Sequence, residues 1–493
     1  MPPLWQPVRH PLLRHRPLIF RADVAAAQPA FPAAERTHYV GLYYARFHAA
    51  HPMLVPHAHF DAQQYPDFLV TAVCLVGKHC TPHRPTEASI SAAFATVAAA
   101  SDADSGHRIQ AFILLALIFF AFNEMAQVSD CLERAAVLAC QSRIDALDEF
   151  SSREHVSSLR RESLLRTWWE LYTVDALAAL LKGVQPTLKT RCIDALPTIP
   201  CTEAQYETGE PAAQSTSYTE FERRTFRSDS PTFSSHFYRT EAVGILRTVL
   251  PLYTRDNSNA QDVEAASMSV ASWTYRLSET SYPFSESLLE CDQLLIQAQM
   301  LVQVASIFLH FPRSNLPSSK PSAVDITCLS NGPQVVENSA LHTVQAIAAS
   351  NELCSMASIL HLRDSHSPLA ICAFLLGTAV QLSVAAECDK CQVDKIQQCR
   401  QRVVLLLGAL RSIGKTWPAV QSAVHLLGPF ADTVFPASSN RPQRMNVSST
   451  SESHATTTTY TYGCEQRPAI VADSAVFQTA FDNEWFNFFQ SET

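Results

Sequence analysis

The chain has 493 residues, of which 47% are hydrophobic and only 12 are glycine. Phosphate-binding loops and tight β-turns consume glycine, so this composition predicts an all-α protein with a large helical core. The formal charge of -9 argues against a broad surface that coats nucleic acid. Any contact with DNA is therefore expected to be made by a local patch or by another protein.

The amino terminus, residues 1–36, is rich in proline and carries four arginines before its first acid, Asp23. Prolines interrupt it before any apolar segment forms, so we expect no signal peptide. We expect a disordered basic tail, either solvated or the product of a misplaced start; a weak nuclear-import or phosphate-contacting patch is the alternative. The arginines are Arg9, Arg14, Arg16 and Arg21.

A first helical lobe is expected from residue 37 to about residue 200. Its longest apolar run, Ala111 to Phe122, has 12 residues. A bilayer span needs about 20 residues, so this run predicts a core helix and no membrane segment. Further along, apolar side chains between residues 164 and 180 recur at helical spacing on more than one face, which predicts a deeply buried helix. Pro197 and Pro200 end this stretch and lead into an extended loop.

Residues 202–235 are rich in Ser, Thr and Glu and poor in aliphatic side chains, so we expect a long surface loop there. Helices of a second lobe resume near Thr240. One later stretch alternates steps of three and four between apolar positions, which predicts a helix-packing seam inside this lobe; a dimer interface is the alternative. The seam positions are Leu288, Cys291, Leu295, Ala298, Val302, Ala305 and Leu309.

The segments Arg166–Asp175 and Leu196–Cys201, together with the setting of Trp417 in residues 413–420, resemble the middle homology region of fungal-specific transcription factors. The resemblance covers about residues 37–435. It implies an all-helical regulatory domain, which in that family usually follows a binuclear zinc-cluster DNA-binding module, and a nuclear location. It also implies that the core of this domain includes Trp168, Trp169, Tyr172 and Asp175.

The 14 cysteines are dispersed, mostly within apolar helical patterns, and the first is Cys74. Buried reduced thiols are expected, as in intracellular proteins. A binuclear zinc cluster needs six cysteines packed into about 30 residues. This sequence has no such cluster, so we expect no zinc cofactor. DNA contact is then expected only through a module encoded upstream or through a partner protein.

Four constellations resemble active or metal sites, and each lacks the necessary context. The His57-x-His59-x-Asp61 spacing has no β-rich surroundings and no second ligand set. Residues 409–416, ending in Gly-Lys-Thr, continue a helical stripe rather than forming a phosphate loop. Cys388, Cys391 and Cys399 are three thiols where a closed zinc site takes four ligands. Asp102 and Asp104 lie in a turn without the second carboxylate cluster that a terpene synthase would need.

The carboxyl-terminal part differs in composition. Residues 436–470 are rich in Ser and Thr and predict a flexible linker. Residues 471–493 surround aromatic side chains at helical spacing with acids, and no Lys or Arg follows Arg467. Such a segment can fold into a coactivator groove; the alternative is a last helix that docks on the protein's own core. The aromatic residues are Phe477, Phe481, Trp485, Phe488 and Phe489.

Together these patterns favour a nuclear transcriptional regulator rather than an enzyme, with a coactivator or the transcription machinery as partner and a dimer as one possible state. The resemblance implies control of one pathway, such as a secondary-metabolite gene cluster. Two alternatives remain open at this stage. One is a partner or corepressor that acts only by heteromeric association, and the other is an all-α enzyme of the terpene-synthase type.

Overall fold

The computed structural model divides into two units, residues 1–437 and 438–493. All residues that it describes lie in the first unit, and every regular element among them is helical, which confirms the all-α class. The described residues are 31–101, 105–142, 144, 157–182, 184–188, 199–210, 221, 223, 233–254, 259–279, 292–316, 338–360, 367–388 and 392–435.

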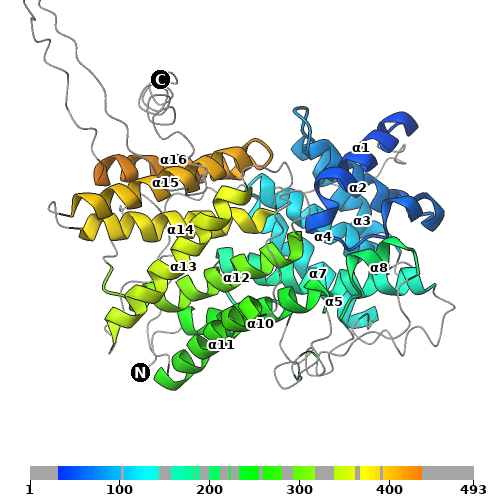
Figure 1. Cartoon of the computed structure of the whole chain (residues 1–493). Coiled ribbons are helices and arrows are strands. Elements are labelled where there is room, and N and C mark those ends of the chain that lie inside the picture. Colours follow the sequence, from blue (N-terminus) through cyan, green and yellow to red (C-terminus); the bar gives the residue numbers. More distant parts are fainter. Residues whose placement is uncertain are drawn as a thin grey trace, which may run out of the picture. The chain divides into compact units, whose positions relative to one another are not determined.

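The first lobe surrounds helix α4, which is buried along almost its whole length and contacts α2, α3, α5 and α7. Figure 1 shows these helices together, with α1 and α2 crossing beside α4. The predicted core helix in this region is therefore confirmed. The helices are α1 (Ala33–Arg46), α2 (Asp67–His79), α3 (Glu87–Ala99), α4 (Ser105–Ala121), α5 (Met125–Ser142), α7 (Ser158–Lys182) and α8 (Glu203–Glu207).

Helix α1 begins at Ala33, so the prediction of a disordered tail that extends to residue 36 is wrong for its last residues. Phe31 is 8% exposed and meets the edge of the Tyr39 ring at 5.5 Å. The Phe31 ring thus packs back onto the helix that begins two residues later. Close packing continues along α1, because a Cβ atom added at Gly77 of α2 would lie 1.9 Å from the carbonyl oxygen of Tyr39. Only glycine lets the two backbones approach so closely.

The surface-loop prediction for residues 202–235 is also wrong at both ends. Residues 203–207 form α8, whose start is stabilised by a reciprocal capping box between Thr202 and Gln205. Tyr206 is fully buried, and its hydroxyl donates to the carbonyl oxygen of Leu54 at 3.2 Å. At the other end, Phe221 and Phe233 are buried, and their rings meet edge to face with centroids 5.0 Å apart. Aromatic burial thus anchors the chain on either side of the connection.

The second lobe is organised around α12, which contacts α10, α11, α13 and α14. The seam positions from Leu295 to Leu309 are buried inside this lobe, so the predicted intramolecular packing is confirmed for them; Leu288 and Cys291 lie outside the described residues. The elements are α10 (Ser235–Thr254), α11 (Ala260–Glu279), α12 (Gln293–His310), η8 (Phe311–Arg313), α13 (Ser339–Leu360), α14 (Pro368–Glu387), α15 (Val393–Gly414) and α16 (Ala419–Val434).

Two described helical stretches, Gln293–Arg313 and Pro368–Glu387, are long and apolar enough to cross a bilayer. Their most apolar windows are 78% and 89% buried within the fold. Each packs against several other helices. Burial against protein explains their apolar composition, as expected for core helices.

The two lobes also meet where the α2–α3 connection contacts the turn between α15 and α16. The His79 ring lies 5.3 Å from the ring of Trp417, and the Arg84 guanidinium donates to the backbone carbonyl of Lys415. Both aromatic partners are buried, at 3% and 2% exposure. The tryptophan near the end of the domain therefore packs on the first lobe.

Candidate functional site

Helix α7 carries charged side chains into the middle of the fold. Glu162, Arg166 and Glu170 follow one another at intervals of four residues, so they share one face of the helix. They are 7%, 1% and 1% exposed. Buried charges are rarely tolerated without partners, and each of these three is paired. This face of α7 is the starting point of the site.

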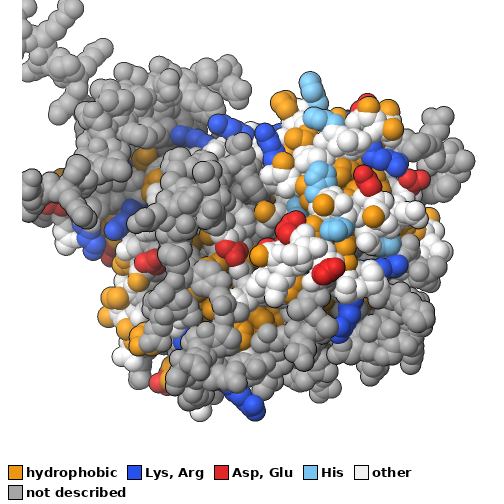
Figure 2. Space-filling view, turned by 45° about the vertical axis from the view of Figure 1, so that its right-hand side comes forward, with side chains coloured by type: hydrophobic (Ala, Val, Ile, Leu, Met, Phe, Trp, Pro, Cys, Tyr) orange, Lys and Arg blue, Asp and Glu red, His pale blue; other side chains and the backbone are white. Residues whose placement is uncertain are grey.

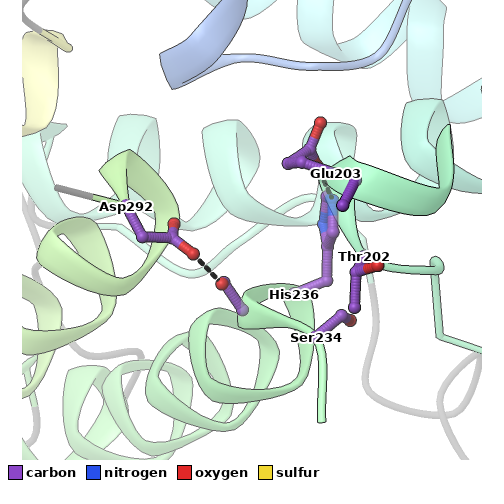
Figure 3. Close-up of a pocket in the computed structure, with 7 residues that line it drawn as sticks. Thr202, Glu203, Ser234, His236 and Asp292 are labelled. Atoms are coloured by element: carbon purple, nitrogen blue, oxygen red, sulfur yellow. Dashed lines mark hydrogen bonds and ion pairs between the residues drawn. The ribbon is translucent and has the colours of Figure 1, made fainter. Parts of the chain in front are cut away.

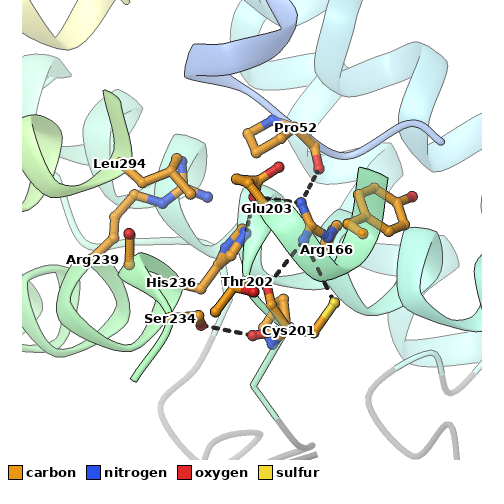
Figure 4. A network of polar contacts seen from close by, with 12 residues as sticks. Pro52, Arg166, Cys201, Thr202, Glu203, Ser234, His236, Arg239 and Leu294 are labelled. Atoms are coloured by element: carbon orange, nitrogen blue, oxygen red, sulfur yellow. Dashed lines mark hydrogen bonds and ion pairs between the residues drawn. The ribbon is translucent and has the colours of Figure 1, made fainter. Parts of the chain in front are cut away.

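Arg166 is the centre of the first part of the site, shown in Figure 4. Its guanidinium donates to Glu162 at 2.9 Å, to Glu203 at 2.6 Å and to the carbonyl oxygen of Cys201 at 3.0 Å. The same group lies 3.8 Å from the centre of the Tyr206 ring. Arg166 therefore ties the segment around α8 to α7, both by charge and by stacking.

Glu203 connects this arginine to the second lobe. Its Oε1 accepts from Arg166 and lies 3.2 Å from Nε2 of His236, which is 2% exposed near the start of α10. Burial alone would raise the pKa of Glu203, but Arg166 and His236 together outweigh it, through charge and hydrogen bonding, and lower the pKa to about 2. Burial lowers the pKa of His236, so a neutral imidazole donates to a charged carboxylate. The Glu203 side chain is 42% exposed, so the network reaches solvent here.

Glu170 forms the second part of the network. One carboxylate oxygen accepts from His51 at 2.7 Å and the other from Arg239 at 2.8 Å. Burial raises the pKa of Glu170, but Arg239 and His51 outweigh it and lower the pKa to about 2. Gln297 of α12 accepts from Arg239 at 3.1 Å and donates to the carbonyl oxygen of Ala50 at 2.8 Å. Polar contacts thus join α7, the turn after α1, α10 and α12.

The four core residues implied by the family resemblance lie in the same helix. Trp168 and Trp169 are each 1% exposed and Tyr172 is 4% exposed. Asp175, 3% exposed, accepts from the backbone amides of Thr187 and Leu188 at 2.9 and 3.0 Å. Arg247 of α10 pairs with Asp175 at 3.2 Å, and its guanidinium lies 4.4 Å from the centre of the Tyr172 ring. Asp175 is therefore the third link from α7 to the second lobe.

A polar pocket of about 190 Å³ opens beside Glu203. Figure 3 shows His236 rising toward Glu203, with Asp292 on one side and Thr202 on the other. The two serine hydroxyls that line the pocket are used in contacts within the fold. Ser234 donates to the carbonyl oxygen of Pro200 at 2.7 Å, and Ser235 donates to Asp292. Asp292 also caps α12 by accepting from two backbone amides. No serine here is hydrogen-bonded to His236, so the lining does not form an activated nucleophile.

The structure also places several of the residue groups that resemble metal or phosphate sites in the sequence. His57, His59 and Asp61 lie in two short 3-10 turns, η2 (His57–His59) and η3 (Asp61–Gln63). Among the described residues, no group of three or more His, Cys, Asp or Glu side chains is placed to hold a metal ion. Residues 409–414 belong to α15, so the phosphate-loop alternative is excluded there. Asp102, Asp104, Cys391 and the five aromatic residues of the carboxyl-terminal segment lie outside the described residues.

Residues 40–281 match the family model described as "Fungal specific transcription factor domain". The chain carries a fungal-specific transcription factor domain. The matched stretch contains α2 to α11 and the second half of α1, and therefore nearly all of the ionic network. Gln297 and the helices from α12 onward follow it. The family and the name of the relative described next point to a transcription factor and not to an enzyme.

A curated relative, "C6 finger domain transcription factor iacK" of Pestalotiopsis fici, is 23% identical over 414 residues. The alignment covers 82% of this chain and 60% of the relative, so the chain spans less than two thirds of that protein's length. No solved structure matches the chain.

The sequence predicts Asp175 in the domain core but does not reveal the residues that pair with α7. Those partners are His51, Glu203, His236, Arg239 and Arg247. One signal was available: charges spaced by four within a helix whose other positions are apolar must be paired when buried. The identity of the partners had no local signal, because Glu170 and Arg239, for example, are 69 residues apart.

Proposed function

We propose that this protein is a nuclear transcriptional regulator and that the helical domain is its regulatory part. The observation that carries the proposal is the match of residues 40–281 to the fungal-specific transcription factor domain. The relative named as a C6 finger domain transcription factor, aligned over 82% of this chain, supports the same assignment.

Within this proposal, the network on α7 is the element that couples the two lobes. Arg166, Glu170 and Asp175 each pair with a residue of another segment, and the desolvated charges make those pairings specific. Glu203 is the part of the network that solvent reaches. A partner or small molecule that contacts Glu203 would compete with Arg166 and His236 for its carboxylate. Regulation is therefore expected to enter at α8.

We further propose that the regulator controls a single pathway, such as a secondary-metabolite biosynthetic gene cluster. The family resemblance supports this finer statement. Deleting the gene and sequencing transcripts should change the expression of one contiguous block of genes, and complementation with the full chain should restore it. Changes scattered across the genome without such a block would contradict the pathway proposal. A fluorescent fusion that stays outside the nucleus would contradict the proposed location.

The coactivator partner is tested on residues 471–493. Fused to a heterologous DNA-binding domain, this segment should activate a reporter, because its aromatic side chains repeat at helical spacing among acids. Replacing Phe481 and Trp485 with alanine should abolish the output, since each would fill a hydrophobic groove. Asn483→Ala is the matched control and should change little. A silent fusion would remove the support for an activating segment.

A second candidate function is that of a partner or corepressor which reaches DNA only through another protein. The sequence observation that favours it is the absence of six closely spaced cysteines in these 493 residues. Chromatin immunoprecipitation before and after depletion of co-purifying regulators separates the two candidates. Occupancy that disappears with the partner supports the second, and occupancy that persists supports the first.

A further inference from the structure

Four basic side chains from three separate parts of the sequence surround the connection between α2 and α3. They are Arg46 at the end of α1, Lys78 in α2, Arg84 in the connection and Lys415 just after α15, and we call them the basic cluster. Arg46 and Lys415 are exposed, and Lys78 and Arg84 are partly exposed. Figure 2 shows Lys and Arg side chains gathered along the upper edge of the face in view.

Contacts with the fold hold this cluster together. Arg46 donates from Nη1 to the carbonyl oxygen of Cys80 at 3.3 Å, and Arg84 donates from Nη2 to the carbonyl oxygen of Lys415. The Lys78 ammonium lies 5.8 Å from the centre of the Phe31 ring. Each arginine uses one nitrogen of a five-donor guanidinium for this contact. The remaining N–H groups are available to a ligand from a side chain that is already positioned.

No described carboxylate pairs with this cluster. The three stretches that form it, residues 36–60, 68–86 and 395–431, contain no Asp or Glu. Within the described part of the chain, none of the four side chains forms an ion pair. By contrast, Arg36, Arg134 and Arg276 each pair with a carboxylate. In a chain with a formal charge of -9, this segregation leaves a local positive surface.

We propose that the basic cluster binds the phosphate backbone of duplex DNA without reading its sequence. The cluster draws its members from three segments of the chain, and Arg46 and Arg84 are held at separate backbone carbonyls, those of Cys80 and Lys415. A duplex presents one phosphate charge per about 1.7 Å of axis, so separate cations can each meet a phosphate. A single small anion would contact only part of such a surface. This inference rests on the proposed function, which brings the protein to DNA, and adds a contact made by the regulatory domain itself.

The magnitude follows from counterion release. If each of the four cations neutralises one phosphate, the logarithm of the association constant falls with the logarithm of salt concentration with a slope of about -3.6 from this surface. Removing two of the charges should reduce the slope by about 2. At 0.1 M salt that corresponds to about a 60-fold loss of affinity.

The test measures anisotropy of a labelled duplex of random sequence against the full chain over a range of KCl concentrations. The variant is Lys78→Gln with Lys415→Gln, because neither side chain donates a hydrogen bond to any residue that the structure describes. The matched control, Arg134→Gln with Lys182→Gln, removes two positive charges from α5 and α7, where they contact Asp130 and Ser129. Thermal melts verify that both proteins fold. We expect a smaller slope and weaker binding for the cluster variant only.

Several outcomes would overturn the proposal: a cluster variant with the slope of the wild type, an equal loss in the control, or no duplex binding by the wild type. Saturation by polyglutamate at the same salt concentration would assign the surface to an acidic protein instead. Saturation by inorganic phosphate at millimolar concentration would assign it to a small anion. Failure here is distinguishable from failure of the proposed function, because the transcript changes on gene deletion do not depend on these two lysines.

Discussion

Replacing Glu170 with glutamine removes the charge that two cationic or donating partners share at the centre of the fold. Among the described residues, the Arg239 guanidinium, 2% exposed, would then have no carboxylate partner and would keep only the neutral Gln297 oxygen, at 3.1 Å, as an unchanged side-chain partner. Leaving a buried charge without its counterion costs about 3 to 5 kcal/mol. A typical domain has only about 5 to 15 kcal/mol of stability, so the loss should be large and easily measured.

The assay is urea unfolding of the full chain, followed by far-ultraviolet circular dichroism. The double variant Glu170→Leu with Arg239→Met removes both charges together and should be less destabilised than Glu170→Gln alone, since no uncompensated charge remains. Arg134→Gln, which breaks a half-exposed pair on α5, is the surface control and should cost less than about 1 kcal/mol. An unfolding midpoint for Glu170→Gln equal to that of the wild type would refute the reasoning. A double variant that loses as much free energy of unfolding as Glu170→Leu and Arg239→Met lose in sum would refute it as well.

Three further predictions concern the core, acid stability and metal content. Trp169→Ala should cost about 3 to 5 kcal/mol, because a side chain 1% exposed leaves a cavity; an unchanged melting midpoint would contradict this. Burial lowers the pKa of His48, His79 and His310 to about 4, so between pH 6.5 and 4 the unfolded chain binds protons that the folded chain does not. The free energy of unfolding should be highest above pH 6.5 and fall by up to about 3 kcal/mol per histidine as the pH drops to 4. His79→Phe should make this pH dependence less steep. The same pH dependence in the variant and the wild type would contradict the prediction. Purified protein should bind less than one equivalent of zinc and give no sequence-specific footprint, because the first cysteine is Cys74; stoichiometric zinc or a specific footprint would overturn this.

Periodicity was sufficient for the helices and for most of the core. The stripes in α7 and α12 were visible because an apolar residue at every third or fourth position has few explanations other than a buried helix. Amino-acid composition predicted the start of α8 less well than its capping residues do. The Ser, Thr and Glu content of residues 202–235 predicts a surface loop, although Thr202 and Gln205 have the spacing of a capping box and begin α8. A cap signal outweighs average polarity where the two conflict.

The site was less accessible to sequence reasoning than the fold. Charge pairs such as Arg166 with Glu203 join residues 37 positions apart, and no local propensity encodes that distance. The basic cluster has the same property, since it combines the end of α1, the α2–α3 connection and the end of α15. Acid-free stretches of sequence identify the candidates, but only the tertiary structure shows that these stretches meet.

The contact between Arg84 and the Lys415 carbonyl spans 331 residues of chain, and this has a consequence for the protein during its synthesis. At about 5 to 20 residues per second, a ribosome needs about 15 to 65 s to make the intervening segment. Throughout that interval the face of His79 that Trp417 later covers has no native partner. The nascent first lobe therefore exposes this face of the His79 ring until Trp417 has been made, and chains terminated before Trp417 would retain that exposure.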